Sequence, residues 1–168
     1  WGDPMNPETT LAPLSSATAK KRVLAQIKLA KDNGATVVYG DEAIDHPGNF
    51  VMPTVLTNFT KDNPIYNQEI FGPVASIYQV DSEEAAIELA NDSSYGLGST
   101  VFSKDVVHTK EVAEKIETGM TFINSGWASH PELPFGGIKN SGYGRELSEL
   151  GFDTFVNEHL VFVPDAAL

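Results

Sequence analysis

The 168-residue sequence contains no cysteine. The chain therefore has no disulfide framework, no metal site built on thiolates and no thiolate nucleophile of its own. Histidine is also scarce, and the spacing of its positions is not typical of metal ligands. The four histidines are His46, His108, His130 and His159. We therefore expect no metal site.

Basic residues are few. Eleven Lys and Arg residues stand against 23 Asp and Glu residues, so the formal net charge is −12 and the isoelectric point is near 4.6. Nucleic-acid-binding proteins draw much of their affinity from clustered Lys and Arg. The cluster Lys20-Lys21-Arg22 is short and falls at the start of an expected helix. The charge balance therefore argues against a nucleic-acid partner.

Long hydrophobic runs are absent. No apolar stretch approaches the roughly 18 to 20 residues that span a bilayer, and the opening residues Trp1 to Pro4 lack the basic and apolar regions of a signal peptide. We therefore expect a cytoplasmic protein without a membrane partner. The hydrophobic content of 41% is sufficient for one sizeable core.

Helical and extended segments alternate along the chain, which predicts an α/β fold. Ser15 or Ser16 is expected to cap a first helix that ends at Gly34, with apolar residues at i, i+4 and i+7. A second helix is expected after Asp81 or Ser82. Asp105 is expected to cap a third, which ends at Gly119.

Extended segments are predicted between these helices, at residues 35–40, 50–56, 74–80, 96–102 and 120–124. Pro53 removes a backbone donor from the second segment, so an edge or irregular strand is expected there. Right-handed crossovers between the later strands predict a largely parallel sheet.

The last third of the chain differs in composition. Residues 125–143 are rich in Gly, Pro, Ser and Asn, and a loop of this length in a compact domain is usually functional. A short helix is expected at 145–150. The segment Thr154 to Val163 is rich in β-branched and aromatic residues, which predicts a terminal strand. Its unpaired edge has to find a partner sheet in the chain or on another subunit.

Glu69 and Phe71 stand just before Gly72-Pro73 at the entry to a predicted strand. A carboxylate can accept hydrogen bonds from both hydroxyls of a ribose, and a phenyl ring can lie against a planar heterocycle. The pair therefore suits a nicotinamide nucleotide. The alternative is a structural turn with a solvated Glu69 and a core Phe71.

A second candidate site lies in the glycine-dense loop of Pro134-Phe135-Gly136-Gly137 and Ser141 to Glu146. The loop is not a GxGxxG dinucleotide fingerprint. Glycines allow a close approach of backbone to a ligand, and Phe135 is the bulky apolar group available to line a pocket. The alternative is a long connection that this one aromatic residue anchors to the core.

Four blocks of this sequence resemble successive blocks of the aldehyde dehydrogenase superfamily, in the same order and at similar spacing. They are NQEIFGPV (67–74), NDSSYGLGSTVF (91–102), GMTFIN (119–124) and PFGGIKNSGYGREL (134–147). The resemblance extends from Gly2-Asp3-Pro4 to the final strand. The stretches SHPELPF (129–135) and 139–147 are most similar to bacterial succinate-semialdehyde dehydrogenases.

The resemblance implies roles for particular residues. Glu69 matches the glutamate that holds the nicotinamide ribose, and Phe71 matches the aromatic residue beside it. Phe135 matches the aromatic lining of the aldehyde tunnel, and Ser129 matches a serine that helps to bind the distal carboxylate of succinate semialdehyde. Two supporting residues complete the set, with a solvated ion pair at a helix start as their alternative reading. They are Arg145, which matches a residue that supports a subunit contact, and Glu146, which matches a glutamate near the active-site water path.

The resemblance also implies what these 168 residues omit. The family oxidises an aldehyde with NAD or NADP through a cysteine thioester, and neither that cysteine nor the general base is in the matched region. We therefore expect no catalytic residue in this chain. We expect a C-terminal fragment that is inactive alone and binds no cofactor by itself, with 1–151 belonging to the catalytic domain and 152–168 forming an oligomerisation strand and tail.

Two other hypotheses remain from the sequence. One is a non-catalytic oligomerisation or interaction module that forms a homo-oligomer through the C-terminal strand. The other is an atypical nucleotide binder that uses Glu69 and Phe71. The residues do not distinguish NAD from NADP.

Overall fold

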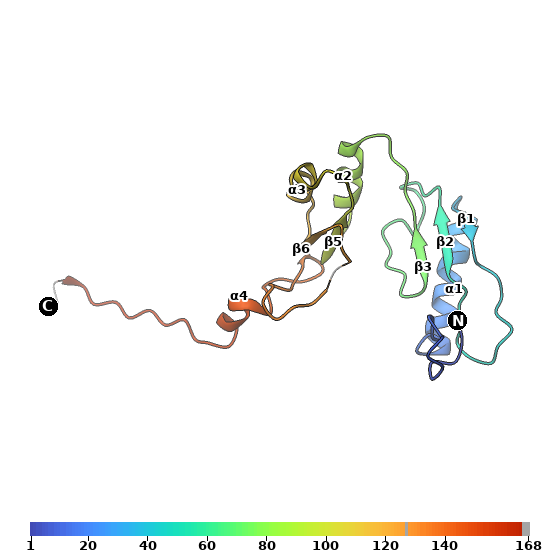
Figure 1. Cartoon of the computed structure of the whole chain (residues 1–168), viewed down its shortest axis with the longest axis horizontal. Helices are drawn as coiled ribbons and strands as arrows, with labels where there is room; N and C mark the ends of the chain where they lie inside the picture. The colour runs from blue at the N-terminus through green and yellow to red at the C-terminus, as the bar shows by residue number, and fades with distance from the viewer. Residues whose placement is uncertain (127, 166–168) are drawn as a thin grey trace. The chain divides into compact units, whose positions relative to one another are not determined.

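The computed structural model describes residues 1–126 and 128–165 (Figure 1). The chain divides into two compact units, Trp1–Val80 and Asp81–Leu168. Helices and strands alternate in both units, so the α/β prediction is confirmed. None of the helices in the described residues is long and apolar enough to cross a membrane.

The first unit is a three-stranded sheet with one helix. The helix is α1 (Ala17–Asp32), and the strands are β1 (Thr36–Tyr39), β2 (Thr54–Thr57) and β3 (Val74–Ser76). Strand β2 is central, with β1 antiparallel and β3 parallel to it. The prediction of an edge strand at 50–56 is therefore wrong. Pro53 lies just outside β2, so its missing N–H removes no bond from the ladder.

Helix α1 forms where the capping pattern predicts it. The Ser16 hydroxyl accepts a hydrogen bond from the Ala19 amide at 3.1 Å, and Gly34, with φ of 97°, follows the helix end. The apolar positions of the helix, Val23, Ile27 and Ala30, are fully buried. Complete burial of a Val or Ile side chain stabilises a fold by about 1.5–3 kcal/mol. This stripe therefore attaches α1 to the sheet.

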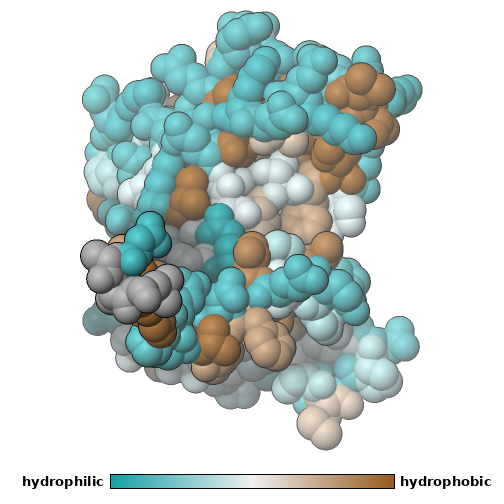
Figure 2. All heavy atoms as spheres, turned by 90° about the vertical axis from the view of Figure 1, so that its left-hand side faces the viewer, coloured by the Kyte–Doolittle hydropathy of each residue, from teal (hydrophilic) through white to brown (hydrophobic). Residues whose placement is uncertain are grey.

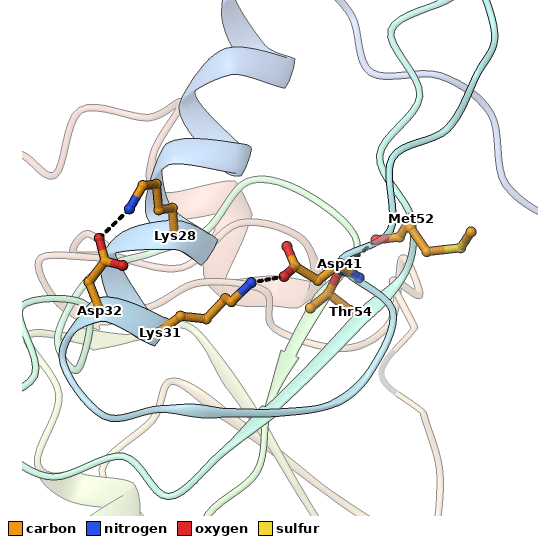
Figure 3. A network of polar contacts seen from close by, with 6 residues as sticks. All are labelled: Lys28, Lys31, Asp32, Asp41, Met52 and Thr54. Atoms are coloured by element: carbon orange, nitrogen blue, oxygen red, sulfur yellow. Dashed lines mark hydrogen bonds and ion pairs between the residues drawn. The ribbon is translucent and has the colours of Figure 1, made fainter.

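A polar network joins the last turn of α1 to the strands (Figure 3). The Lys31 ammonium group forms an ion pair with the Asp41 carboxylate. The Asp41 amide donates to the Thr54 hydroxyl at 3.2 Å, and this hydroxyl donates to the Met52 carbonyl at 2.8 Å. Thr54 is buried, so its hydroxyl group is satisfied within the protein. The network fixes the entry to β2.

The described residues of the second unit form three helices and four short strands. In chain order they are α2 (Glu83–Asn91), β4 (Tyr95–Gly96), β5 (Gly98–Val101), α3 (Val106–Ala113), β6 (Met120–Ile123), β7 (Ile138–Lys139) and α4 (Ser148–Asp153). Ser82 and Asp105 cap α2 and α3, as the sequence predicts. Strands β5 and β6 are parallel across the α3 crossover, which is also confirmed.

Other expectations for the sheet were not met. The described residues form three small sheets rather than one, and β4 pairs with β7 in antiparallel orientation. Helix α3 ends at Ala113, earlier than Gly119, and α4 begins at Ser148 rather than at Arg145. A largely parallel sheet is therefore not formed by these residues alone.

The C-terminal segment is extended but not paired. Residues 157–164 form no strand, so the strand expected at 154–163 is not observed within this chain (Figure 1). Its apolar side chains are exposed: Phe155 by 90%, Leu160 by 84% and Phe162 by 76%. A strand requires a neighbour for its backbone groups, and this segment has none in the described part of the chain.

Candidate functional site

The loop that carries Glu69 and Phe71 runs from Asn67 to Pro73 and is supported by α1. The Gln26 side-chain amide donates to the Glu69 carbonyl and to the Gln68 side-chain oxygen, both at 3.3 Å. Gly72 lies so close to α1 that an added Cβ would be 2.8 Å from a Val23 methyl group. The backbone of the loop is therefore held tightly against the helix.

The side chains of the loop point to solvent. Glu69 is exposed, and its carboxylate has no hydrogen bond or ion pair with the described residues. The Phe71 ring is 63% exposed and lies 5.9 Å from the Arg22 guanidinium carbon, within the range of a cation–π contact. The alternative reading of Phe71 as a core residue is therefore wrong. The braced loop therefore presents a free carboxylate and an exposed ring to solvent.

Two tyrosines lie near this loop. Tyr66 and Tyr78 are in edge contact, with ring centroids 5.8 Å apart. Burial raises the pKa of Tyr78 above its ordinary value, and the neighbouring Tyr66 raises this pKa further. Tyr78 is therefore neutral at physiological pH and is not a candidate base.

The second candidate loop follows β6. Asn124 ends the strand with φ of 53°, and its side chain exchanges hydrogen bonds with the Ser103 backbone at 2.8 and 2.9 Å. Phe135 is half-buried and pairs with Glu146 through two backbone hydrogen bonds. The backbone between them turns at Gly136 and Gly144, which have φ of 158° and 75°.

Arg145 supports this loop through two hydrogen bonds to its backbone. Its guanidinium group donates to the Gly137 carbonyl at 3.0 Å and to the Gly144 carbonyl at 2.6 Å. Glu146 is exposed, and no ion pair between it and Arg145 is found among the described residues. Arg145 therefore braces the glycine loop, which differs from the ion pair that was its alternative reading.

Ser129 lies in an exposed stretch of the same loop, without a hydrogen bond to the described residues. An open hollow is found further along the loop, at Pro134. It is lined by Glu132, Pro134, Ser148, Glu149, Leu150 and Phe152. The lining includes the acidic residues Glu132 and Glu149, whose negative charge would repel a carboxylate ligand.

The predicted residues thus form two groups, one in each unit. Glu69 and Phe71 belong to the first, and Phe135, Arg145 and Glu146 to the second. Sequence reasoning missed Gln26, whose contacts with the first group cross more than forty positions of sequence. A polar residue next to the buried stripe of α1, four positions after Arg22, was the available signal. The described residues contain no cluster of three acidic or histidine side chains suited to a metal ion.

Comparison with known proteins identifies relatives of the chain. Residues 1–161 match the model of the aldehyde dehydrogenase family. The chain is 52% identical over 160 residues to the NADP(+) succinate-semialdehyde dehydrogenase of Deinococcus radiodurans, which covers 95% of this chain. It is 43% identical to the enzyme of the same name from Mycobacterium avium, with 96% of this chain covered.

The fold has close counterparts among solved structures. The crystal structure of succinic semialdehyde dehydrogenase from Streptococcus pyogenes in complex with NADP+ superposes with a TM-score of 0.94 at 74% identity. It covers 98% of this chain, and the match covers 36% of that structure's chain. The NAD+ complex of an aldehyde dehydrogenase from Bacillus cereus superposes with a TM-score of 0.85 at 42% identity, over 90% of this chain and 31% of its own. The chain spans about a third of the length of the curated relatives described above.

Proposed function

Because the chain belongs to the aldehyde dehydrogenase family, we propose that it is part of an NADP-dependent enzyme that oxidises succinate semialdehyde to succinate. The observation that carries this proposal is the 74% identity and TM-score of 0.94 with the NADP+ complex from Streptococcus pyogenes. The names of the relatives from Deinococcus radiodurans and Mycobacterium avium support the same substrate and cofactor.

The first group of residues fits a nicotinamide nucleotide. Glu69 offers a free, exposed carboxylate that can accept hydrogen bonds from both hydroxyls of the nicotinamide ribose. The open Phe71 ring can lie against the nicotinamide plane. When bound, NADP+ accepts a hydride from the substrate, so its ribose has to be held in one orientation. The contacts of α1 with this loop supply the necessary rigidity.

The residues of the second candidate loop are assigned to binding of the aldehyde substrate or to support of that loop. We assign Phe135 to the wall of the substrate tunnel and Ser129 to the distal carboxylate of succinate semialdehyde. Arg145 holds the glycine loop that carries Phe135, and Glu146 lies at its closing bridge. Water and one hydride acceptor balance the reaction: aldehyde, water and NADP+ give carboxylate, NADPH and two protons.

The 168 residues supply no nucleophile of the family's kind, because they contain no cysteine. We therefore expect the isolated chain to be inactive with succinate semialdehyde and either NADP+ or NAD+, and to bind neither cofactor. Turnover above a buffer control would contradict the first expectation. A heat of binding in a titration with either cofactor would contradict the second.

The decisive experiment uses the complete subunit that contains this chain. We expect NADPH formation with succinate semialdehyde, and a higher KM for NADP+ in the Glu69→Gln variant because a neutral amide is a weaker acceptor than a carboxylate. The exposed acid Glu42 provides a matched control, and Glu42→Gln is expected to leave this KM unchanged. Absence of oxidation with succinate semialdehyde would overturn the proposed substrate.

The C-terminal segment supports a second role, as an assembly element. Its exposed side chains Phe155, Leu160 and Phe162 accompany unpaired backbone groups. A second copy of the subunit offers a sheet edge for such a segment, which gives a homo-oligomer. Figure 2 shows hydrophobic side chains, in brown, among hydrophilic ones on one face of the molecule. Light scattering tests this role, and a monomer at all concentrations would contradict it.

A further inference from the structure

Helix α1 contacts the loop of Glu69 through one polar side chain, that of Gln26. Its amide nitrogen is 3.3 Å from two acceptors, the Glu69 carbonyl oxygen and the Gln68 side-chain oxygen. The carbonyl oxygen can only accept, so the NH2 end of the Gln26 amide has to face the loop. The orientation of this side chain is therefore determined by the backbone of Glu69.

The oxygen end of the Gln26 amide differs from its nitrogen end. The Gln26 Oε1 atom is buried and has no hydrogen-bond partner among the described residues. A buried acceptor without a partner destabilises the folded state. The NH2 end of the amide nonetheless lies on the two acceptors of the loop, so the polar contacts of the Gln26 side chain are directed to residues 68 and 69.

The hydrogen bond from Gln26 fixes the backbone of Glu69, the residue whose carboxylate is free. The Glu69 carboxylate has no restraint of its own among the described residues, so its direction depends on the backbone of residue 69. Two neighbouring contacts hold the next part of the loop: Val23 against Gly72 and Arg22 near Phe71. Neither contact reaches the backbone of Glu69.

We propose that Gln26 is a positioning residue, which directs the Glu69 carboxylate towards the ribose of the nicotinamide nucleotide. This inference rests on the proposed function, because it assumes that Glu69 binds the cofactor. Gln26 itself does not touch the cofactor in this proposal; it acts through the carbonyl of residue 69.

The test uses the complete subunit and the variant Gln26→Met, which keeps the length of the side chain but removes its donor. We expect the KM for NADP+ to rise about threefold to tenfold, the loss expected for one hydrogen bond, and the KM for succinate semialdehyde to stay unchanged. Hydrogen exchange of the amides at 68–72 should become faster without cofactor. The variant Gln26→Lys retains a donor of sufficient length and should restore a KM near that of the wild type.

Two further variants separate the contributions. Lys28→Met changes an exposed residue of the same helix that has no contact with the loop, and it should alter neither KM. Gln68→Ala removes one of the two acceptors and should have the smaller effect if the Glu69 carbonyl is the important partner. An equal rise of both KM values in Gln26→Met, or no rise of the KM for NADP+, would overturn the positioning role.

The failure of the inference is distinguishable from that of the proposed function. If Glu69→Gln leaves the KM for NADP+ unchanged, the role of Glu69 is wrong and the positioning role of Gln26 is wrong with it. If Glu69→Gln raises this KM while Gln26→Met does not, only the positioning role is wrong. If Gln26→Met does not fold, failure of Gln26→Lys to retain a normal KM for NADP+ also overturns it.

Discussion

Phe135 and Glu146 exchange two backbone hydrogen bonds: the Phe135 amide donates to the Glu146 carbonyl at 2.8 Å, and the Glu146 amide donates to the Phe135 carbonyl at 2.7 Å. The bridge closes the glycine-dense loop, and Arg145 braces the same loop through the Gly137 carbonyl. Phe135, which the resemblance assigns to the aldehyde tunnel, is thereby held by one short antiparallel contact.

Gly119 is predicted to be essential for the position of this loop. A Cβ at residue 119 would lie 1.9 Å from the Gly136 carbonyl oxygen, which is backbone and cannot rotate away. We expect Gly119→Ala to lower the free energy of unfolding by about 1–3 kcal/mol, a typical cost of overpacking. Urea unfolding followed by circular dichroism measures this. Gly126→Ala is the control, because a Cβ there meets no atom within 4 Å; equal stability of the two variants would contradict the prediction.

Asn63 is predicted to stabilise the end of α1. Its buried side chain donates to the Ala30 carbonyl at 2.9 Å and to the Asn33 carbonyl at 3.2 Å, and accepts from the Ile65 amide at 3.0 Å. Asn63→Ala would leave these backbone groups without partners, so we expect a loss of about 1–3 kcal/mol. Thermal unfolding at matched pH provides the measurement. Asn140→Ala removes an exposed amide and should have no measurable effect.

His108 is predicted to make stability depend on pH. Its ring lies 2.5 Å from the Glu83 carboxylate of α2 and 3.4 Å from that of Glu111. The hydrogen bond to Glu83 and the charge of Glu83 raise the pKa of His108 above 6.5, with a further increase from Glu111. Since the folded state binds the proton more tightly, this stabilisation is fully present below pH 6.5 and is lost as the pH rises through the higher folded-state pKa.

The measurement for His108 is the difference in melting temperature between the wild type and His108→Gln across this pH range. We expect the wild type to be the more stable at low pH and the difference to shrink as the pH rises. His130→Gln, at an exposed position, serves as the control for general effects of pH. A difference that grows with pH would show that the sign is wrong.

The ion pair of Lys31 and Asp41 is predicted to contribute modestly. The Asp41 side chain is 22% exposed and that of Lys31 is 43% exposed, so solvent weakens the attraction. We expect Asp41→Asn to cost about 0.2–1 kcal/mol at low ionic strength and less at high salt, with the φ of 70° at this position tolerated by asparagine. Chemical unfolding at two salt concentrations tests this. The more exposed pair of Lys28 and Asp32 gives the control Asp32→Asn, which should change stability less.

Helix starts were predictable because their chemistry is local. Ser16, Ser82 and Asp105 each accept a hydrogen bond from the amide three positions later, so no distant residue is needed to recognise them. Strand pairing was less predictable. Strand β2 is central because β1, which precedes it in the sequence, and β3, which follows it, both pair with it. Pro53 gave a wrong prediction because it stands just before the first residue of β2.

The candidate site shows the same division. Glu69 and Phe71 could be proposed as site residues from residue type and order. The contribution of Gln26 could not, because its contacts with the loop join residues more than forty positions apart. The role of Arg145 as a brace was missed for a related reason: its partners are backbone carbonyls, and nothing in the residue types of Gly137 and Gly144 marks those carbonyls as acceptors.

The sequence by itself determined the helix caps, the buried stripe of α1, the resemblance to aldehyde dehydrogenases and the absence of a thiol, since each depends on residue identity and short-range spacing. Only the tertiary structure decided the strand order, the attachment of the Glu69 loop to α1 and the lack of a partner strand for the C-terminal segment among the described residues. These features depend on contacts between distant segments, where backbone groups of any residue type serve as donors and acceptors. Residue type therefore carries little information about them.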